Sequence, residues 1–347
     1  MNFGKRLSWL CGVALLVSSC DRAKRLVDDV KDKVSGAGNK EGAAVVPAKS
    51  ASEEQPVDPG LQAKVDGGGG TYRFRKDLPF PQTFSVRMTE RVEYLEGRML
   101  LQSALGREGV PLHANLEAVS RVDMAPGAVT LTIEKPMHVV VVPDKDGKLP
   151  ELPPAPVAAD SAELEGKTAR FGKTDGGWKM VVPAGERDFK TYVWGQSVER
   201  HLDPLLCEAG ATPRKLWFSP RGRLSPGGTV NLRGQEVGMV FAGATGNLKL
   251  VLESVGAVNG HPCGVFQISG EIDVKGMPEM DGGLTDATLS VTSGKVWLSL
   301  LYPLVLKEDM QIIESMVTGL PGGAMMRAEG KVHHLVEREW LSAGAAK

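Results

Sequence analysis

The chain has 347 residues, of which 42% are hydrophobic and only 5% aromatic, and its formal net charge is −1. This length is enough for one large domain or two smaller ones with a sizeable core. A nucleic-acid binder needs a concentrated basic face to displace counterions from phosphates, and no lysine and arginine cluster supplies one. The 42 glycines and 22 prolines favour turns and short strands over long helices.

The first 20 residues have the pattern of an export signal. Lys5 and Arg6 precede an apolar run, Leu7 to Val17, which is too short to cross about 30 Å of hydrocarbon as a helix. Small residues then lead into a cysteine, in the order Val17-Ser18-Ser19-Cys20. This segment resembles the lipobox of bacterial lipoproteins, and the resemblance covers residues 1–20 alone.

The lipobox resemblance implies a signal peptide at residues 1–19 and a diacylglycerol on the Cys20 thiol. Two or three acyl chains hold a protein stably on a membrane. The implied location is the cell envelope, at the inner or the outer membrane, with the body in the periplasm or at the cell surface. The membrane is then the first expected partner.

Residues 20–70 are predicted to form a tether. Residues 21–33 are charged and long enough for two or three helical turns, but an isolated helix of this length is marginal in water. Residues 34–70 contain no aromatic residue and end in four glycines, Gly67 to Gly70. This composition buries too little surface to offset chain entropy, so the segment is predicted to be disordered.

The body, from Thr71 to Trp340, is predicted to be mainly β. Apolar residues alternate with polar or small residues, as they do at Leu248, Leu250 and Leu252. Turn dipeptides recur between such runs, at Glu96-Gly97, Asp146-Gly147, Asp175-Gly176, Asn259-Gly260 and Asp281-Gly282. Long alternating runs after Thr285 favour an antiparallel meander. A short helix is expected at residues 203–209, where Asp203 is placed to cap it and Gly210 to end it.

A proline-rich segment at residues 149–166 is predicted to be a linker or long loop. It separates a first β lobe, residues 71–148, from a second β lobe, residues 167–340, and residues 341–347 form a tail. The segments 116–135 and 252–271 align without gaps and share several identities, with both turns expected at the aspartate or asparagine and proline positions. The alignment has two explanations, a duplicated hairpin in two related lobes or a chance match of valine-rich hairpins.

Cys207 and Cys263 remain after Cys20 is lipidated, and they are predicted to form a disulfide in an oxidising envelope. The alternatives are two separate buried thiols or a metal site with His201 and His261, whose spacings do not match the close ligand pairs of zinc sites. His333 and His334 are adjacent on a predicted strand and would point to opposite faces, which prevents them from sharing a metal. No metal and no cofactor are expected.

The sequence contains no nucleophile elbow, no metalloprotease helix, no phosphate loop and no dinucleotide fingerprint. We therefore expect a protein that is not an enzyme. Trp178, Trp194 and Trp297 are candidates for ligand contact, although tryptophans of β proteins more often pack in the core or at its rim.

Three functions stay open at this stage. The first is a non-catalytic binding or structural module for another envelope component. The second is a carrier or sensor of an apolar ligand or lipid on a concave β sheet. The third, a hydrolase with dispersed catalytic residues, has no motif in its favour.

Overall fold

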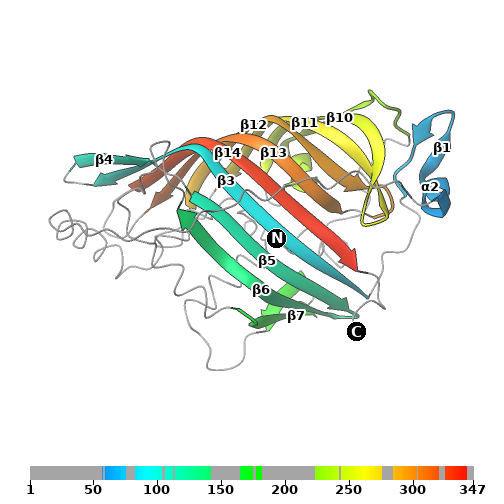
Figure 1. The fold of residues 1–347 in the computed structure, drawn as a ribbon, viewed down its shortest axis with the longest axis horizontal. Coiled ribbons are helices and arrows are strands. Elements are labelled where there is room, and N and C mark those ends of the chain that lie inside the picture. The colour runs from blue at the N-terminus through cyan, green and yellow to red at the C-terminus, as the bar shows by residue number, and fades with distance from the viewer. Residues whose placement is uncertain are drawn as a thin grey trace, which may run out of the picture.

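The computed structural model describes residues 57, 59–75, 83–103, 106–111, 114–141, 165–174, 177–181, 223–241, 244–275, 284–302, 304–319 and 325–341. Its main feature is a single sheet of 12 strands, curved along its length (Figure 1). All the strand pairs of this sheet in the described residues are antiparallel. The prediction of a mainly β, antiparallel fold is confirmed.

The elements follow one another in a simple order. The sheet contains β3 (Phe84–Ser103), β4 (Gly106–Pro111), β5 (Ala114–Ala125), β6 (Ala128–Val141), β7 (Thr168–Thr174), β8 (Gly177–Val181), β9 (Thr229–Arg233), β10 (Thr245–Val258), β11 (His261–Lys275), β12 (Leu284–Ser299), β13 (Val305–Gly319) and β14 (Met325–Leu341). Outside it lie helix α2 (Pro59–Val65), the 3-10 helix η4 (Gly234–Met239) and a small hairpin of β1 (Asp66–Gly68) and β2 (Thr71–Tyr72).

Strands from both predicted lobes share this one sheet. The strands β9 to β14 form a meander, as predicted for the part after Thr285, and β14 then pairs with β3, from Met325 with Gln102 to Leu341 with Ser85. On the far side of β3 the sheet continues through β5, β6, β7 and β8, while β4 pairs with the end of β3 and projects away from α2 and β1 (Figure 1). The lobe boundaries stay a prediction, but hydrogen bonding runs without a break from one to the other.

Of the five dipeptides predicted to form turns, the structure describes two, and one of these two forms a turn. Asn259-Gly260 forms the β10–β11 turn, with φ angles of 50° and 77° that suit asparagine and glycine. The turn predicted at Glu96-Gly97 is wrong, because both residues continue β3. Gly97 pairs there with Gly330, and a Cβ added to Gly330 would lie 2.6 Å from the Glu96 carbonyl oxygen, so close packing of the two strands explains Gly330. The other three dipeptides lie outside the described residues.

The two aligned segments are both hairpins, β5–β6 and β10–β11. Their turns, however, fall at residues 126–127 and 259–260. The gapless alignment pairs Pro126 with Pro262, which lies beyond the second turn in β11. Because the alignment does not superimpose the turns, the structure adds no support for a duplicated unit.

The prediction of a disordered tether is wrong over residues 59–70. Val65, at the end of α2, is 0% exposed, and its carbonyl oxygen accepts a hydrogen bond of 2.9 Å from the Arg73 amide. Gly68, Gly69 and Gly70 take positive φ angles between 62° and 78° and turn the chain from β1 into β2. The glycine run is therefore a tight turn. The helix expected at residues 203–209 lies outside the described residues.

One face of the sheet, called here the core face, carries most of the buried side chains, although Val265 and Trp297 are buried on the opposite face in β11 and β12. Residues paired across antiparallel strands lie on the same face, so the strand register traces it. One row crosses the sheet through Phe266, Val296, Glu308, Val336 and Glu90. A second row crosses through Trp340, Val86, Val122, Leu131 and Ala169. The alternating leucines of β10 face the same way and are buried, as predicted.

At the β9–β12 end, other parts of the chain cover the core face. Val237, Val240 and Phe241, in and after η4, join the cluster formed by the β10 leucines, as does Val65 of α2. Phe74 stacks on Phe266 with ring centroids 6.2 Å apart. This end is a conventional filled core.

Candidate functional site

Six polar side chains interrupt the apolar core face and are called here the polar band. Each is at most 6% exposed, and they come from β3, β13 and β14: Glu90, Tyr94, Glu308, Glu314, His334 and Arg338. Burial of ionisable groups costs free energy unless they are paired, so such a band requires an explanation beyond packing.

The strand register explains why these residues meet. His334, Val336 and Arg338 alternate along β14 and therefore share the core face. Val336 pairs with Glu308 on one side and Glu90 on the other, which places a carboxylate on either side of β14.

Glu308 and Arg338 form the innermost contact. The Arg338 Nη1 donates to Glu308 Oε1 at 2.7 Å and to the Val305 carbonyl oxygen at 3.1 Å. The two side chains are 0% and 2% exposed. Burial nevertheless raises the pKa of Glu308, against the opposing effect of the Arg338 charge. The second carboxylate oxygen, Oε2, has no hydrogen-bond partner within the described structure.

His334 and Glu90 form a second contact, with His334 Nε2 3.3 Å from Glu90 Oε1. Both charges act on Glu308, His334 lowering the pKa of that carboxyl and Glu90 raising it. The band thus contains three carboxyl groups against one arginine and one histidine. Its balance is acidic unless a carboxyl stays protonated or a cation joins it.

Glu314 and Tyr94 form the third contact, a hydrogen bond between their side chains. Burial raises the pKa of Glu314 to about 7, although Tyr94 and the His334 charge act in the opposite direction. Burial together with the Glu314 charge raises the pKa of Tyr94 well above its usual value. Glu314 Oε1 has no hydrogen-bond partner among the described residues.

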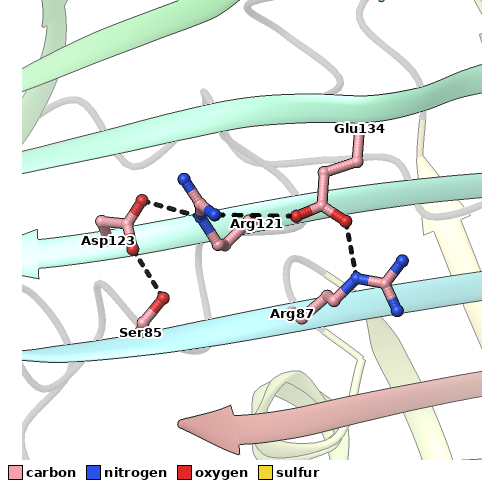
Figure 2. Close-up of polar contacts among 5 residues, drawn as sticks. All are labelled: Ser85, Arg87, Arg121, Asp123 and Glu134. Atoms are coloured by element: carbon pink, nitrogen blue, oxygen red, sulfur yellow. Dashed lines mark hydrogen bonds and ion pairs between the residues drawn. The ribbon is translucent and has the colours of Figure 1, made fainter. Parts of the chain in front are cut away.

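The opposite face carries exposed ion pairs across β3, β5 and β6 (Figure 2). Arg87 lies 2.6 Å from Glu134, and Arg121 lies 3.1 Å from Asp123, which also accepts a hydrogen bond from Ser85. These charged side chains are 27% to 44% exposed. Exposed pairs contribute at most about 1 kcal/mol each, so they mark the solvent side of the sheet.

The two adjacent histidines lie on opposite faces, as predicted. His334 belongs to the buried polar band, whereas His333 is 30% exposed and its Nε2 lies 2.8 Å from Asp309 Oδ1. Among the described residues, no group of three or more histidine, cysteine, aspartate or glutamate side chains is arranged to hold a metal ion.

Of the predicted disulfide, the structure describes one cysteine. Cys263 is a fully buried free thiol that donates to the His261 carbonyl oxygen at 3.3 Å, and burial raises its pKa. Cys207, like Cys20, lies outside the described residues. The Cys207–Cys263 bond and the lipidation of Cys20 therefore stay predictions.

Of the three candidate tryptophans, only Trp297 has a described side chain. It is 7% exposed, and the Lys307 Nζ lies 5.0 Å from the centre of its ring. This places Trp297 in the core rather than at a binding rim. Trp178 lies in β8 with its side chain outside the description, and Trp194 lies outside the described residues.

Another tryptophan, Trp340, is more prominent than those three. Its ring stacks on Phe84 at 4.5 Å and lies 5.9 Å from both Tyr302 and His261. His261 also contacts the Ser299 hydroxyl at 2.6 Å, and burial lowers the pKa of this histidine to about 4. These rings close one end of the core face.

Sequence reasoning missed the polar band altogether. The sequence contains one signal of it. Val332, Val336 and Arg338 are separated by even numbers of residues in β14, so the charged Arg338 lies on the same face of the strand as the two valines.

Comparisons with known proteins give no family. No protein-family model matches the chain, and no curated protein matches it. A lipovitellin structure, concerned with lipid–protein interactions, is 12% identical with a TM-score of 0.38 and covers 78% of this chain. The chain covers 26% of that lipovitellin chain, about a quarter of its length.

A second structure is a proposed outer membrane lipoprotein-sorting protein domain from Vibrio parahaemolyticus. Its sequence is 8% identical and its TM-score is 0.13. The match covers 74% of this chain and 87% of the Vibrio parahaemolyticus chain. Neither structure is described as an enzyme. At these TM-scores the likenesses do not establish a shared fold. No described helix is long and apolar enough to cross a membrane.

Proposed function

We propose that this protein is a non-enzymatic module, tethered to an envelope membrane through Cys20, that holds an amphiphilic lipid on the core face of its sheet. The observation that carries the proposal is the composition of this face. It is apolar over nearly its whole width and contains a buried, acidic polar band. A lipid, with apolar chains and a polar group at one end, matches both parts.

The acyl chains belong on the half of the core face formed by β3, β5, β6 and β7. Its side chains are apolar: Phe84, Val86, Val122, Met124, Val129, Leu131, Ile133, Ala169 and Phe171. Among the described elements, α2 contacts β11, and η4 contacts β9 and β10, so neither helix lies on this half. These side chains are at most 7% exposed and belong to one cluster that also contains Cys263, Val265, Trp297, Leu304 and Leu306, so a lipid on this half has to displace that packing.

The head of the lipid belongs at the polar band. A purely apolar ligand would leave the Glu308 Oε2 and Glu314 Oε1 oxygens buried and without hydrogen bonds, at a cost of roughly 1–3 kcal/mol each. A polar group beside either oxygen removes part of that cost. The band thus favours an amphiphile over a hydrocarbon.

The alternative, a module that binds another envelope protein, receives less support. The solvent face offers charged side chains, but those of Arg87, Arg121, Asp123 and Glu134 are paired with one another (Figure 2). The predicted lipid anchor agrees with either function, because it holds the sheet close to a source of lipids and to envelope proteins.

The proposal is tested by native mass spectrometry of the full chain carrying Cys20→Ser, exported to a bacterial periplasm and purified without detergent. We expect a chain with one bound lipid mass, or one that takes up lipid from vesicles of phosphatidylethanolamine and phosphatidylglycerol. A chain that stays bare after incubation with both lipids contradicts the proposal.

A further inference from the structure

Glu314 occupies an unusual place on the core face. The row that crosses the sheet at this level runs from Leu289 through Glu314 to Gly330 and Gly97. The two glycines have no side chains, so Glu314 is the only polar side chain of the row and has no side chain beside it on β14 or β3. Gly330 and Gly97 are partly exposed, whereas Glu314 is 3% exposed.

The carboxyl group of Glu314 is only half satisfied. Tyr94 forms a hydrogen bond with it, and Oε1 has no hydrogen-bond partner among the described residues. Within the described structure, no lysine or arginine forms an ion pair with Glu314, and His334 is the one cationic group that acts on it. A buried carboxyl in this state can accept a further hydrogen bond, most favourably from a donor that carries positive charge.

We propose that Glu314, supported by Tyr94, binds the primary ammonium group of an amphiphile, as found on an ethanolamine phospholipid. This inference rests on the proposed function and names the class of lipid. The ammonium donates to Oε1 and supplies the charge that the site lacks, while the Tyr94 hydroxyl stays on the carboxyl group.

The same contacts argue against other head groups. An anionic head would lie near three carboxyl groups, while Arg338 is already engaged by Glu308 at 2.7 Å. A choline head carries a charge but no N–H donor, so Oε1 would stay without a hydrogen bond. The site therefore distinguishes a primary amine from both.

The experiment is a calorimetric titration of the full chain carrying Cys20→Ser with three short-chain lipids: phosphatidylethanolamine, its N-acetyl derivative and phosphatidylcholine. We expect the free amine to bind at least about tenfold more tightly than either of the others. In Glu314→Gln we expect this preference to fall to within about twofold. The matched control is Glu253→Gln on the solvent side, which should keep the preference.

The outcomes separate the two proposals. If none of the three lipids binds, the proposed function itself is contradicted. If all three bind with equal affinity, the lipid-binding function stands and the amine site is overturned. The comparison of the three lipids on the chain with native Glu314 needs no substitution in the core, so the test holds even if Glu314→Gln fails to fold.

Discussion

At the scale of single residues, the buried Glu308–Arg338 pair decides more stability than any exposed pair. Removing one partner of a buried ion pair leaves an uncompensated charge, which costs about 3–5 kcal/mol. We therefore expect Arg338→Met to lower the free energy of unfolding by this amount in urea denaturation. Arg87→Met, which breaks the exposed pair with Glu134 in Figure 2, should cost about 1 kcal/mol or less. Equal losses in the two variants would contradict the buried pairing.

Glu314 makes the stability depend on pH. Its folded-state pKa, about 7, lies above the ordinary value of 4.5, so folding favours the protonated form. The stabilising contribution is fully present below about pH 4.5 and is lost as the pH rises through 7, on the order of 3 kcal/mol in total. Tyr94 and His334 are the polar groups that act on this carboxyl.

We expect Glu314→Gln to gain stability relative to the native chain between pH 5 and pH 8, by about 2–3 kcal/mol in urea denaturation at the two pH values. The amide does not titrate, so the difference between the two chains isolates this carboxyl from His261 and Glu308. Glu253→Gln serves as the control. A difference that is constant with pH would show that Glu314 is ionised throughout.

At the scale of elements, the β10–β11 hairpin depends on a close backbone approach at Gly270. This residue has a φ of 136°, and a Cβ added to it would clash with the Asn247 carbonyl oxygen. We expect Gly270→Ala to cost more than about 2 kcal/mol, because strain and overlap act together. Gly127, with a φ of 74° and open space around it, is the control and should cost about 1 kcal/mol. Thermal unfolding of both variants measures the difference.

The β12–β13 connection is held by one hydroxyl group. Ser299 Oγ accepts hydrogen bonds from the Leu301 and Tyr302 amides, at 3.2 Å and 3.1 Å, and contacts His261 Nε2 at 2.6 Å. We expect Ser299→Ala to lower stability by about 2–3 kcal/mol, since it leaves buried polar groups unsatisfied. Ser290→Ala, at an exposed hydroxyl on the same strand, should be close to neutral. Urea denaturation of both variants provides the test.

The strands and turns could be predicted from the sequence where apolar and polar residues alternate regularly and where the residues of a turn themselves favour its backbone angles. The leucines of β10 and the Asn259-Gly260 turn are examples, since both depend on neighbours in sequence. The turn expected at Glu96-Gly97 was wrong because both residues pair with β14 within β3, a contact between strands far apart in sequence. The prediction of disorder was wrong at Gly67 to Gly70 because composition alone does not distinguish a tight turn from a flexible tether.

At the scale of the whole molecule, the pairing of β14 with β3 creates the candidate site. This pairing brings Glu90 into contact with His334, which lies 244 residues later in the sequence. No local pattern contains this information. The sequence indicated that alternating strands would form an apolar face, but the polar band arises only when β3, β13 and β14 lie side by side.

The central claim is that the core face, and not the charged solvent face, holds a lipid. The most direct measurement is photo-crosslinking of the full chain carrying Cys20→Ser with a phosphatidylethanolamine that bears a diazirine in its acyl chain, followed by peptide mapping. We expect labels on the core face of β3, β5 and β6, at Val86, Val122 and Leu131. Labels at Arg87, Arg121 and Thr132 instead, or equal labelling of both faces, would contradict it.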